Sequence, residues 1–445
     1  MKPFRVLVVD DSAFMRKIFS DFIERDPSFQ VVGTADNGLD AVRKVKELNP
    51  DVITLDVEMP EMNGLDALKF IMESGPRPVI MLSGINEQGM KETILALEAG
   101  AFDFIRKPSI SNALDIEQVR SELMKQLNAA MQAKQRRALW EEEEQRRRSA
   151  DITVPLSPKP SDKTLNKKPQ LNETRTTVRE TDQRSKRMDS PRLPSSRTVE
   201  KKMPTVTDGA EPSGSKRKRA DRKPVADLAP VVLPENEGRQ LREAKIPQST
   251  ELTDLVAVGC STGGPRALKA FLEPIPGDFC APIVIVQHMP PSFTKSLAQR
   301  LNSFSQLEVM EAEQGMVLEP GKAYIAPGGS HMRVYRSDSG AYQIRISQDE
   351  TRNGHRPSVD VLFESLLPLT MIKRHAVLMT GMGSDGARMM KKLYDSGVTS
   401  TYAESEQTCV VYGMPRSAVE LGCVSHVLPL HDIAPRMVQA VNNGK

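Results

Sequence analysis

Short apolar runs alternate with helical patterns over the first 107 residues. Five runs of strand length are rich in β-branched and aromatic residues, which is typical of buried strands. They span residues 4–9, 29–34, 52–55, 79–82 and 102–105. Between them, apolar residues at three- and four-residue spacing predict helices. These span residues 14–23, 41–48, 65–72 and 93–97. Alternation on this period predicts a doubly wound parallel sheet of the (βα)5 type.

A second region with the same character follows residue 250. Apolar runs at 255–258, 282–286 and 376–379 predict three strands, and each runs into a loop before a helical segment. This pattern predicts a second doubly wound, mostly parallel α/β domain. The chain therefore divides into a first domain over 1–125, a connecting segment over 126–250 and a second domain over 251–440.

The connecting segment has a different composition from the two domains. A helical pattern continues from Glu117 to about residue 148, which predicts a helical extension of the first domain. Residues 151–250 then hold 22 Lys and Arg against 14 Asp and Glu, 12 of the 32 Pro, and no Phe, Tyr or Trp. Such a segment cannot bury enough apolar surface to offset the entropy of ordering it, so we expect a disordered linker. Its net charge of +8 leaves −5 for the rest of a chain whose total is +3.

The basic cluster at 216–219 allows two interpretations. It could contact nucleic acid or an anionic membrane, or it could be a solvated charge cluster. No aromatic residue is interleaved to stack on bases, which favours the solvated cluster. The four Cys form no CxxC pair, no apolar run reaches 18 residues, and the start of the chain lacks the apolar region of a signal peptide. We therefore expect a soluble cytoplasmic protein that neither binds nucleic acid nor inserts into a membrane.

Charged and hydroxyl side chains stand at the carboxyl ends of the strands in the first domain. The first strand leads into Asp10 and Asp11, the third into Asp56, the fourth into Ser83 and the fifth into Lys107. Ligands of such sheets bind beyond these ends. Three carboxylates brought together repel one another, and hard oxygen ligands of this kind suit Mg²⁺.

This constellation resembles a response-regulator receiver domain. The resemblance implies that Asp56 accepts a phosphoryl group from a partner histidine kinase. It implies that Asp10, Asp11, Asp56 and the backbone carbonyl of Glu58 hold Mg²⁺. Lys107 would pair with phosphate oxygens, and Ser83 and Phe104 would form the switch pair that reports phosphorylation to one surface.

The second domain places Ser261, His288 and Asp385 after three successive predicted strands. Taken singly, Ser261 could be part of a phosphate-binding turn, His288 a structural residue and Asp385 a helix N-cap. Together they supply a nucleophile, a general base and an orienting carboxylate on one edge of a parallel sheet. Backbone N–H groups of the loop at Met382 could hold the oxyanion of an acyl-transfer reaction.

The sequence Gly259-x-Ser261-x-Gly263 also fits the nucleophile elbow of α/β-hydrolases, but those enzymes order their triad Ser, acid, His. Here His288 precedes Asp385. The motifs GCSTGG, QHMP and TGMGSDGA, with APGGSH and HRPSVD, instead resemble the catalytic domain of the chemotaxis methylesterase (CheB) family. The resemblance gives Thr262 a supporting role in the active site.

The resemblance implies a phosphorylation-activated enzyme that hydrolyses glutamyl methyl esters, and deamidates Gln, on the cytoplasmic helices of chemotaxis receptors. Hydrolysis would need no cofactor. In the family the unphosphorylated receiver covers the catalytic cleft, and we expect the long linker of this chain, longer than is usual there, to weaken that inhibition. His331, His355 and Asp360 could line the cleft or stabilise loops.

Two other functions are compatible with parts of the sequence. One is a response regulator whose output binds nucleic acid through the basic linker, although no basic recognition helix is visible after residue 251. The other is an esterase that serves a signalling system other than chemotaxis.

Overall fold

The computed structural model describes residues 2–84, 86–109, 112–151 and 252–443. The predicted disordered linker and its basic cluster therefore lie outside the described residues, except for Asp151. The described residues before the linker and those after it belong to one compact unit. Among the described residues, no helix has both the length and the apolar character needed to cross a bilayer.

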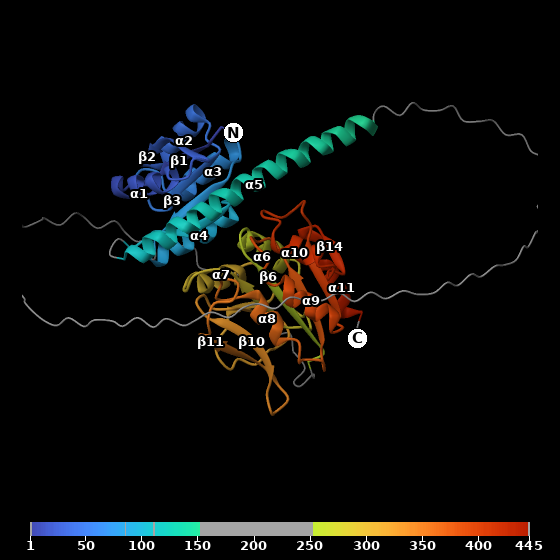
Figure 1. The fold of residues 1–445 in the computed structure, drawn as a ribbon. Coiled ribbons are helices and arrows are strands. Elements are labelled where there is room, and N and C mark those ends of the chain that lie inside the picture. The colour runs from blue at the N-terminus through green and yellow to red at the C-terminus, as the bar shows by residue number, and fades with distance from the viewer. Residues whose placement is uncertain (1, 85, 110–111, 152–251, 444–445) are drawn as a thin grey trace, which may run out of the picture. The chain divides into compact units, whose positions relative to one another are not determined.

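The first domain is a five-stranded parallel sheet with the order β2-β1-β3-β4-β5, shown in blue and cyan in Figure 1. Its strands are β1 (Phe4–Val9), β2 (Phe29–Ala35), β3 (Val52–Asp56), β4 (Val79–Ser83) and β5 (Asp103–Arg106). Its helices are α1 (Ala13–Glu24), α2 (Gly38–Leu48), α3 (Gly64–Ser74), α4 (Glu87–Glu98) and α5 (Ala113–Asp151). Helices α1 and α5 pack together on one face, and α2, α3 and α4 form a row on the other. The predicted doubly wound receiver-type fold is confirmed.

Side-chain caps decide where several of these helices begin. Asn37, Asn63 and Asn86 each accept a hydrogen bond from the backbone N–H three residues later. An N-cap of this kind satisfies an N–H that the helix itself leaves unpaired. Helices α2 and α4 consequently begin before the apolar spacing that predicted them, at Gly38 and Glu87.

The second domain is a seven-stranded sheet with the order β14-β13-β12-β6-β7-β9-β8, in which every pair of neighbours is parallel. Its strands are β6 (Asp254–Cys260), β7 (Ile283–Gln287), β8 (Glu308–Glu311), β9 (Lys322–Ile325), β12 (Lys373–Leu378), β13 (Ser400–Glu404) and β14 (His426–Leu428). Its helices are α6 (Gly264–Leu272), α7 (Phe293–Asn302), α8 (Val359–Ser365), α9 (Ala387–Asp395), α10 (Met414–Glu420) and α11 (Leu430–Asn442). The predicted mostly parallel α/β fold is confirmed.

The apolar pattern of the sequence predicts only β6, β7 and β12 of this domain. The pattern does not predict the antiparallel hairpin of β10 (His331–Arg336) and β11 (Tyr342–Ser347), which forms a separate two-stranded sheet. The three strands that it does predict are central, because β6 pairs with β7 on one side and with β12 on the other. The chain reverses its direction of winding at β6, and such a reversal opens a crevice beyond the carboxyl ends of the strands.

Candidate active site and phosphoacceptor site

Ser261 follows β6 on a tight turn into helix α6. Its backbone N–H donates to the carbonyl of Thr380, 2.9 Å away, in the loop after β12. The turn needs glycine at two positions: Gly263 has a φ of +80°, and a Cβ on Gly264 would lie 1.8 Å from Oε1 of Gln287. The GCSTGG sequence thus brings the serine close to both neighbouring strands.

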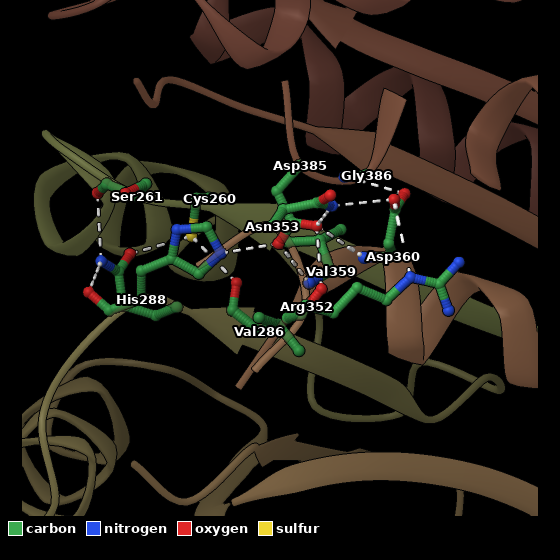
Figure 2. Close-up of polar contacts among 12 residues, drawn as sticks. Cys260, Ser261, Val286, His288, Arg352, Asn353, Val359, Asp360, Asp385 and Gly386 are labelled. Carbon is green, nitrogen blue, oxygen red and sulfur yellow. Dashed lines mark hydrogen bonds and ion pairs between the residues drawn. The ribbon is translucent and has the colours of Figure 1, made fainter. Parts of the chain in front are cut away.

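His288 follows β7 and pairs with Asp385, as predicted for an imidazole and its orienting carboxylate. Nε2 of His288 lies 2.8 Å from Oδ2 of Asp385, and the two side chains are 6% and 2% exposed. Nδ1 is buried and has no hydrogen-bond partner among the described residues. In Figure 2, Asp385 lies on one side of the imidazole and Ser261 beyond the other. The free nitrogen is therefore the one left to receive a proton.

Asp385 is held by several donors besides His288. It accepts hydrogen bonds from the side chains of Asn353 (2.7 Å) and Ser358 (2.8 Å) and from the backbone N–H of Val359 (2.7 Å). Burial by itself would raise the pKa of Asp385, but the hydrogen bonds from His288, Asn353 and Val359 bring that pKa well below its usual range. The carboxylate is thus ionised at neutral pH and fixes the tautomer of the imidazole.

Two of the three residues whose role the sequence left open support loops. Oδ1 of Asp360 accepts the backbone N–H groups of Gly386 (3.1 Å) and Met389 (3.2 Å) at the start of α9. Nδ1 of His331 lies 3.2 Å from the backbone N of Ser358, so the nitrogen accepts that hydrogen bond. Both residues therefore fix the segments that surround Asp385.

His355 contacts the proposed base directly. Its ring stacks on the ring of His288 with 3.8 Å between centroids and 7° between planes. The pKa of His355 is lowered to about 4, mainly by burial and to a smaller extent by the neighbouring His288. His355 is therefore neutral at physiological pH and packs as a flat ring against the imidazole.

The loop after β12 contacts Ser261 at Gly381, the residue before Met382: a Cβ on Gly381 would lie 2.8 Å from Cβ of Ser261. The N–H groups of Met382 and Gly383 appear in none of the hydrogen bonds of the described residues. Gly383 has a φ of +79°, which allows the loop to turn sharply at this point. These two N–H groups are accordingly available to an oxyanion.

Carboxylates of the first domain gather at the carboxyl ends of β1 and β3. Asp10, Asp11 and Asp56 bring one oxygen each within 4.8 Å of the others. Nζ of Lys107 lies 2.8 Å from Asp10 and 2.6 Å from Asp56. Burial raises the pKa of Asp56 to about 6, against the lowering effect of Lys107. Three hard oxygen donors around one point fit Mg²⁺.

The remaining receiver residues surround this cluster. The carboxylate of Glu58 accepts a hydrogen bond from the side chain of Asn86 (2.7 Å), and the backbone N–H of Glu58 donates to Oδ1 of Asp56 (3.4 Å). The hydroxyl of Ser83 accepts a hydrogen bond from Thr93 (2.7 Å). Phe104 stacks on Phe293 of the second domain with 4.6 Å between ring centroids. One member of the predicted switch pair thus contacts the other domain.

Two polar contacts accompany this ring pair. Oγ1 of Thr262 donates to Oδ2 of Asp103, 2.6 Å away, so the residue next to Ser261 is bound to β5. Arg300 of α7 forms a two-pronged ion pair with Glu98 of α4, with N–O distances of 2.9 to 3.2 Å. Asp103, Glu98 and Arg300 could not be predicted from the sequence, because no motif marks them.

Known families match both domains. Residues 256–437 match the CheB methylesterase family, and residues 6–117 match the response regulator receiver domain. A protein-glutamate methylesterase/protein-glutamine glutaminase of Geobacillus kaustophilus is 39% identical over 441 residues, which cover 99% of each chain. One of Bacillus subtilis is 38% identical over 438 residues, which cover 98% of each. The crystal structure of the Thermotoga maritima CheB methylesterase catalytic domain is 42% identical, covers 42% of this chain and 98% of its own, and superposes with a TM-score of 0.41.

These matches bear on two of the expectations from the sequence. Both relatives align with this chain over nearly their whole length, and the expectation that its long linker weakens inhibition by the receiver stays a prediction. The match over 256–437 assigns the second domain to an esterase family, against an output that binds nucleic acid.

Proposed function

We propose that this chain, which belongs to the CheB methylesterase family, hydrolyses glutamyl methyl esters on chemotaxis receptors through Ser261, His288 and Asp385. The observation that carries the proposal is the buried His288–Asp385 pair, whose free Nδ1 lies at the same sheet edge as Ser261. The names of the relatives indicate protein-glutamate methylesterase and protein-glutamine glutaminase activity. Deamidation of Gln would use the same site.

The reaction follows from the roles of these side chains. Nδ1 of His288 takes the proton of Ser261 Oγ as that oxygen attacks the ester carbonyl, and the N–H groups of Met382 and Gly383 hold the resulting oxyanion. The tetrahedral intermediate breaks its bond to methoxide, which leaves as methanol with the proton from His288. Water, deprotonated by His288, then attacks the acyl carbon of the acyl-enzyme. The bond from that carbon to Ser261 Oγ breaks, Oγ takes the proton back from His288, and the glutamate carboxyl is released. Asp385 stabilises the imidazolium in both steps.

Phosphorylation of Asp56 would control access to this site. A histidine kinase is the proposed phosphodonor, and Asp10, Asp11, Asp56 and the carbonyl of Glu58 would hold Mg²⁺, which offsets the negative charge of the phosphoryl oxygens. Lys107 would bind one of those oxygens. The stacked Phe104–Phe293 pair and the Thr262–Asp103 hydrogen bond support a state in which the unphosphorylated receiver restrains the esterase.

The biological setting follows from the substrate. Removal of methyl groups from receptor helices resets receptor signalling, which is sensory adaptation, and the methylated helices lie on the cytoplasmic side of the membrane. We therefore place the protein in the cytoplasm, with the receptors and the kinase as its partners.

The test is methanol release from methylated receptors in membranes, with and without phosphoramidate as the phosphodonor. Ser261→Ala should abolish release. Asp56→Asn should leave the basal rate but remove stimulation by the phosphodonor. Full turnover by Ser261→Ala would disprove the triad assignment, and stimulation of Asp56→Asn would disprove receiver control.

A further inference from the structure

A buried carboxyl group that the mechanism does not use lies behind the nucleophile. Glu404 is the last residue of β13, the strand beside β12, and it is fully buried. Its Oε2 accepts the backbone N–H of Thr380 at 2.8 Å. Its Oε1 is also buried. Burial raises the pKa of this carboxyl, and the side chains of Thr408 and Cys409 lower that pKa by less.

Thr380 connects Glu404 to the nucleophile. The carbonyl of Thr380 accepts the N–H of Ser261 at 2.9 Å, and its hydroxyl donates to the carbonyl of Thr262 at 2.9 Å. The same hydroxyl accepts the N–H of Val411 at 3.0 Å. One threonine therefore binds the backbone of the nucleophile and of the residue after it, and its own N–H is held by Glu404.

The packing at this point leaves little freedom for the loop to shift. A Cβ placed on Gly381 would lie 2.8 Å from Cβ of Ser261, so the loop backbone directly contacts the nucleophile. Gly381 is in turn tied to the 411–414 segment by three backbone hydrogen bonds of 2.9 to 3.2 Å. A movement of Thr380 would displace both Ser261 and the N–H groups at Met382. Acyl transfer is sensitive to displacements of this kind.

We propose that Glu404 is a positioning residue for Ser261: its carboxyl fixes Thr380, and Thr380 holds the nucleophile and the oxyanion loop in register. The proposal rests on the function proposed above for Ser261. A carboxyl group is suited to the task because the N–H of Thr380 is buried, and without an acceptor it would remain unsatisfied. An amide in place of the carboxyl would supply the same acceptor.

The experiment compares Glu404→Ala with Glu404→Gln in the full chain, saturated with phosphoramidate so that the receiver does not limit the rate. Methanol release gives kcat and KM, and a fluorophosphonate gives the labelling rate of Ser261 without a receptor. We expect Glu404→Ala to lower kcat and the labelling rate ten- to a hundredfold with little change in KM. Glu404→Gln should restore both to within about threefold of the wild type.

Ser400→Ala is the matched control. Ser400 is the first residue of the same strand, is buried, and shares a hydrogen bond of 2.7 Å with Nδ1 of His375. Its loss should lower the thermal unfolding midpoint and leave kcat unchanged, because it lies at the other end of β13. Loss of kcat in Ser400→Ala equal to that in Glu404→Ala would show that any buried defect in β13 has the effect, and would overturn the proposal.

Other outcomes separate this inference from the function on which it rests. If Ser261→Ala is inactive and Glu404→Ala folds with wild-type kcat, the inference is wrong and the proposed function stands. If Ser261→Ala remains active, the triad itself is wrong. If Glu404→Ala does not fold, Thr380→Val takes its place, because it removes the hydroxyl that binds the carbonyl of Thr262. Thr380→Ser keeps that hydroxyl and is the comparison. Wild-type kcat in Thr380→Val would then overturn the inference. A ten- to hundredfold loss of kcat in Glu404→Gln would also overturn it.

Discussion

The ion pair between Glu98 and Arg300 offers the sharpest test of the proposed restraint of the esterase by the receiver. Glu98 ends α4 of the receiver, and Arg300 lies on α7 of the esterase domain. The Glu98 side chain is 10% exposed and the Arg300 side chain 38% exposed. We choose Glu98→Ala because Arg300 also lies over the ring of Phe304, 4.9 Å from its centroid, and replacing it would remove that packing as well.

The magnitude follows from the geometry of the pair. Hydrogen bonds to charged groups contribute about 1.5–3 kcal/mol, and exposed ion pairs about 0–1 kcal/mol. Glu98 is largely desolvated and Arg300 is partly exposed, so we take the contribution of this two-pronged pair as about 1.5 kcal/mol, where the two ranges approach each other. That free energy shifts the equilibrium between restrained and open states by about tenfold. Basal methanol release should therefore rise by up to about tenfold, and the rate with saturating phosphoramidate should not change.

The control is Lys391→Ala, which breaks an exposed ion pair with Asp395 inside α9 and changes the charge by one unit without touching the receiver. Glu98→Arg combined with Arg300→Glu should return the basal rate toward that of the wild type. The reasoning is refuted if Glu98→Ala folds normally and keeps the wild-type basal rate, or if it raises the basal and the stimulated rates equally.

Two further predictions concern the two sites separately. The pKa of His355 is about 4 in the fold, below its usual 6.5, so stability that is fully present above pH 6.5 should be lost as the pH falls toward 4, by at most about 3 kcal/mol. His355→Gln should reduce the difference between the free energies of unfolding in urea at pH 7 and at pH 5. The variant keeps His288, Asp385 and Lys125, the groups that act on the pKa of His355. An unchanged difference would show that His355 is not the source of the pH dependence. Chelation of Mg²⁺ with EDTA should abolish stimulation by phosphoramidate but leave basal methanol release intact, and a fall in the basal rate would contradict a metal-free esterase.

The strand-end rule explains why so much of the candidate site could be predicted from sequence. Parallel strands bring residues that are far apart in the chain to one edge, so Ser261, His288 and Asp385 could be grouped once β6, β7 and β12 were recognised. The same rule grouped Asp10, Asp56 and their neighbours. Neither grouping needed side-chain geometry, because adjacency follows from strand order alone.

The residues that hold these groups in place could not be predicted in this way. Asn353 lies on a loop, with a φ of +56°, and reaches Asp385 across 32 positions of sequence. Glu404 ends a strand that the apolar pattern missed, since β13 reads Ser-Thr-Tyr-Ala-Glu and is nonetheless wholly buried. A side chain whose partner is a backbone N–H leaves no complementary residue type to search for.

A second Ser-His-Asp set shows that residue types alone do not define an active site. Nε2 of His375 lies 2.9 Å from Asp254, and Nδ1 lies 2.7 Å from Ser400. These residues begin β6 and β13 or lie near the start of β12, so they occupy the amino edge of the same sheet. Both ring nitrogens of His375 are hydrogen-bonded and its side chain is fully buried, so a substrate cannot reach it. These three residues therefore connect β6, β12 and β13 structurally. His288 differs in the two respects that matter for catalysis: its Nδ1 has no partner among the described residues, and it stands at the carboxyl edge, where loops can admit a substrate.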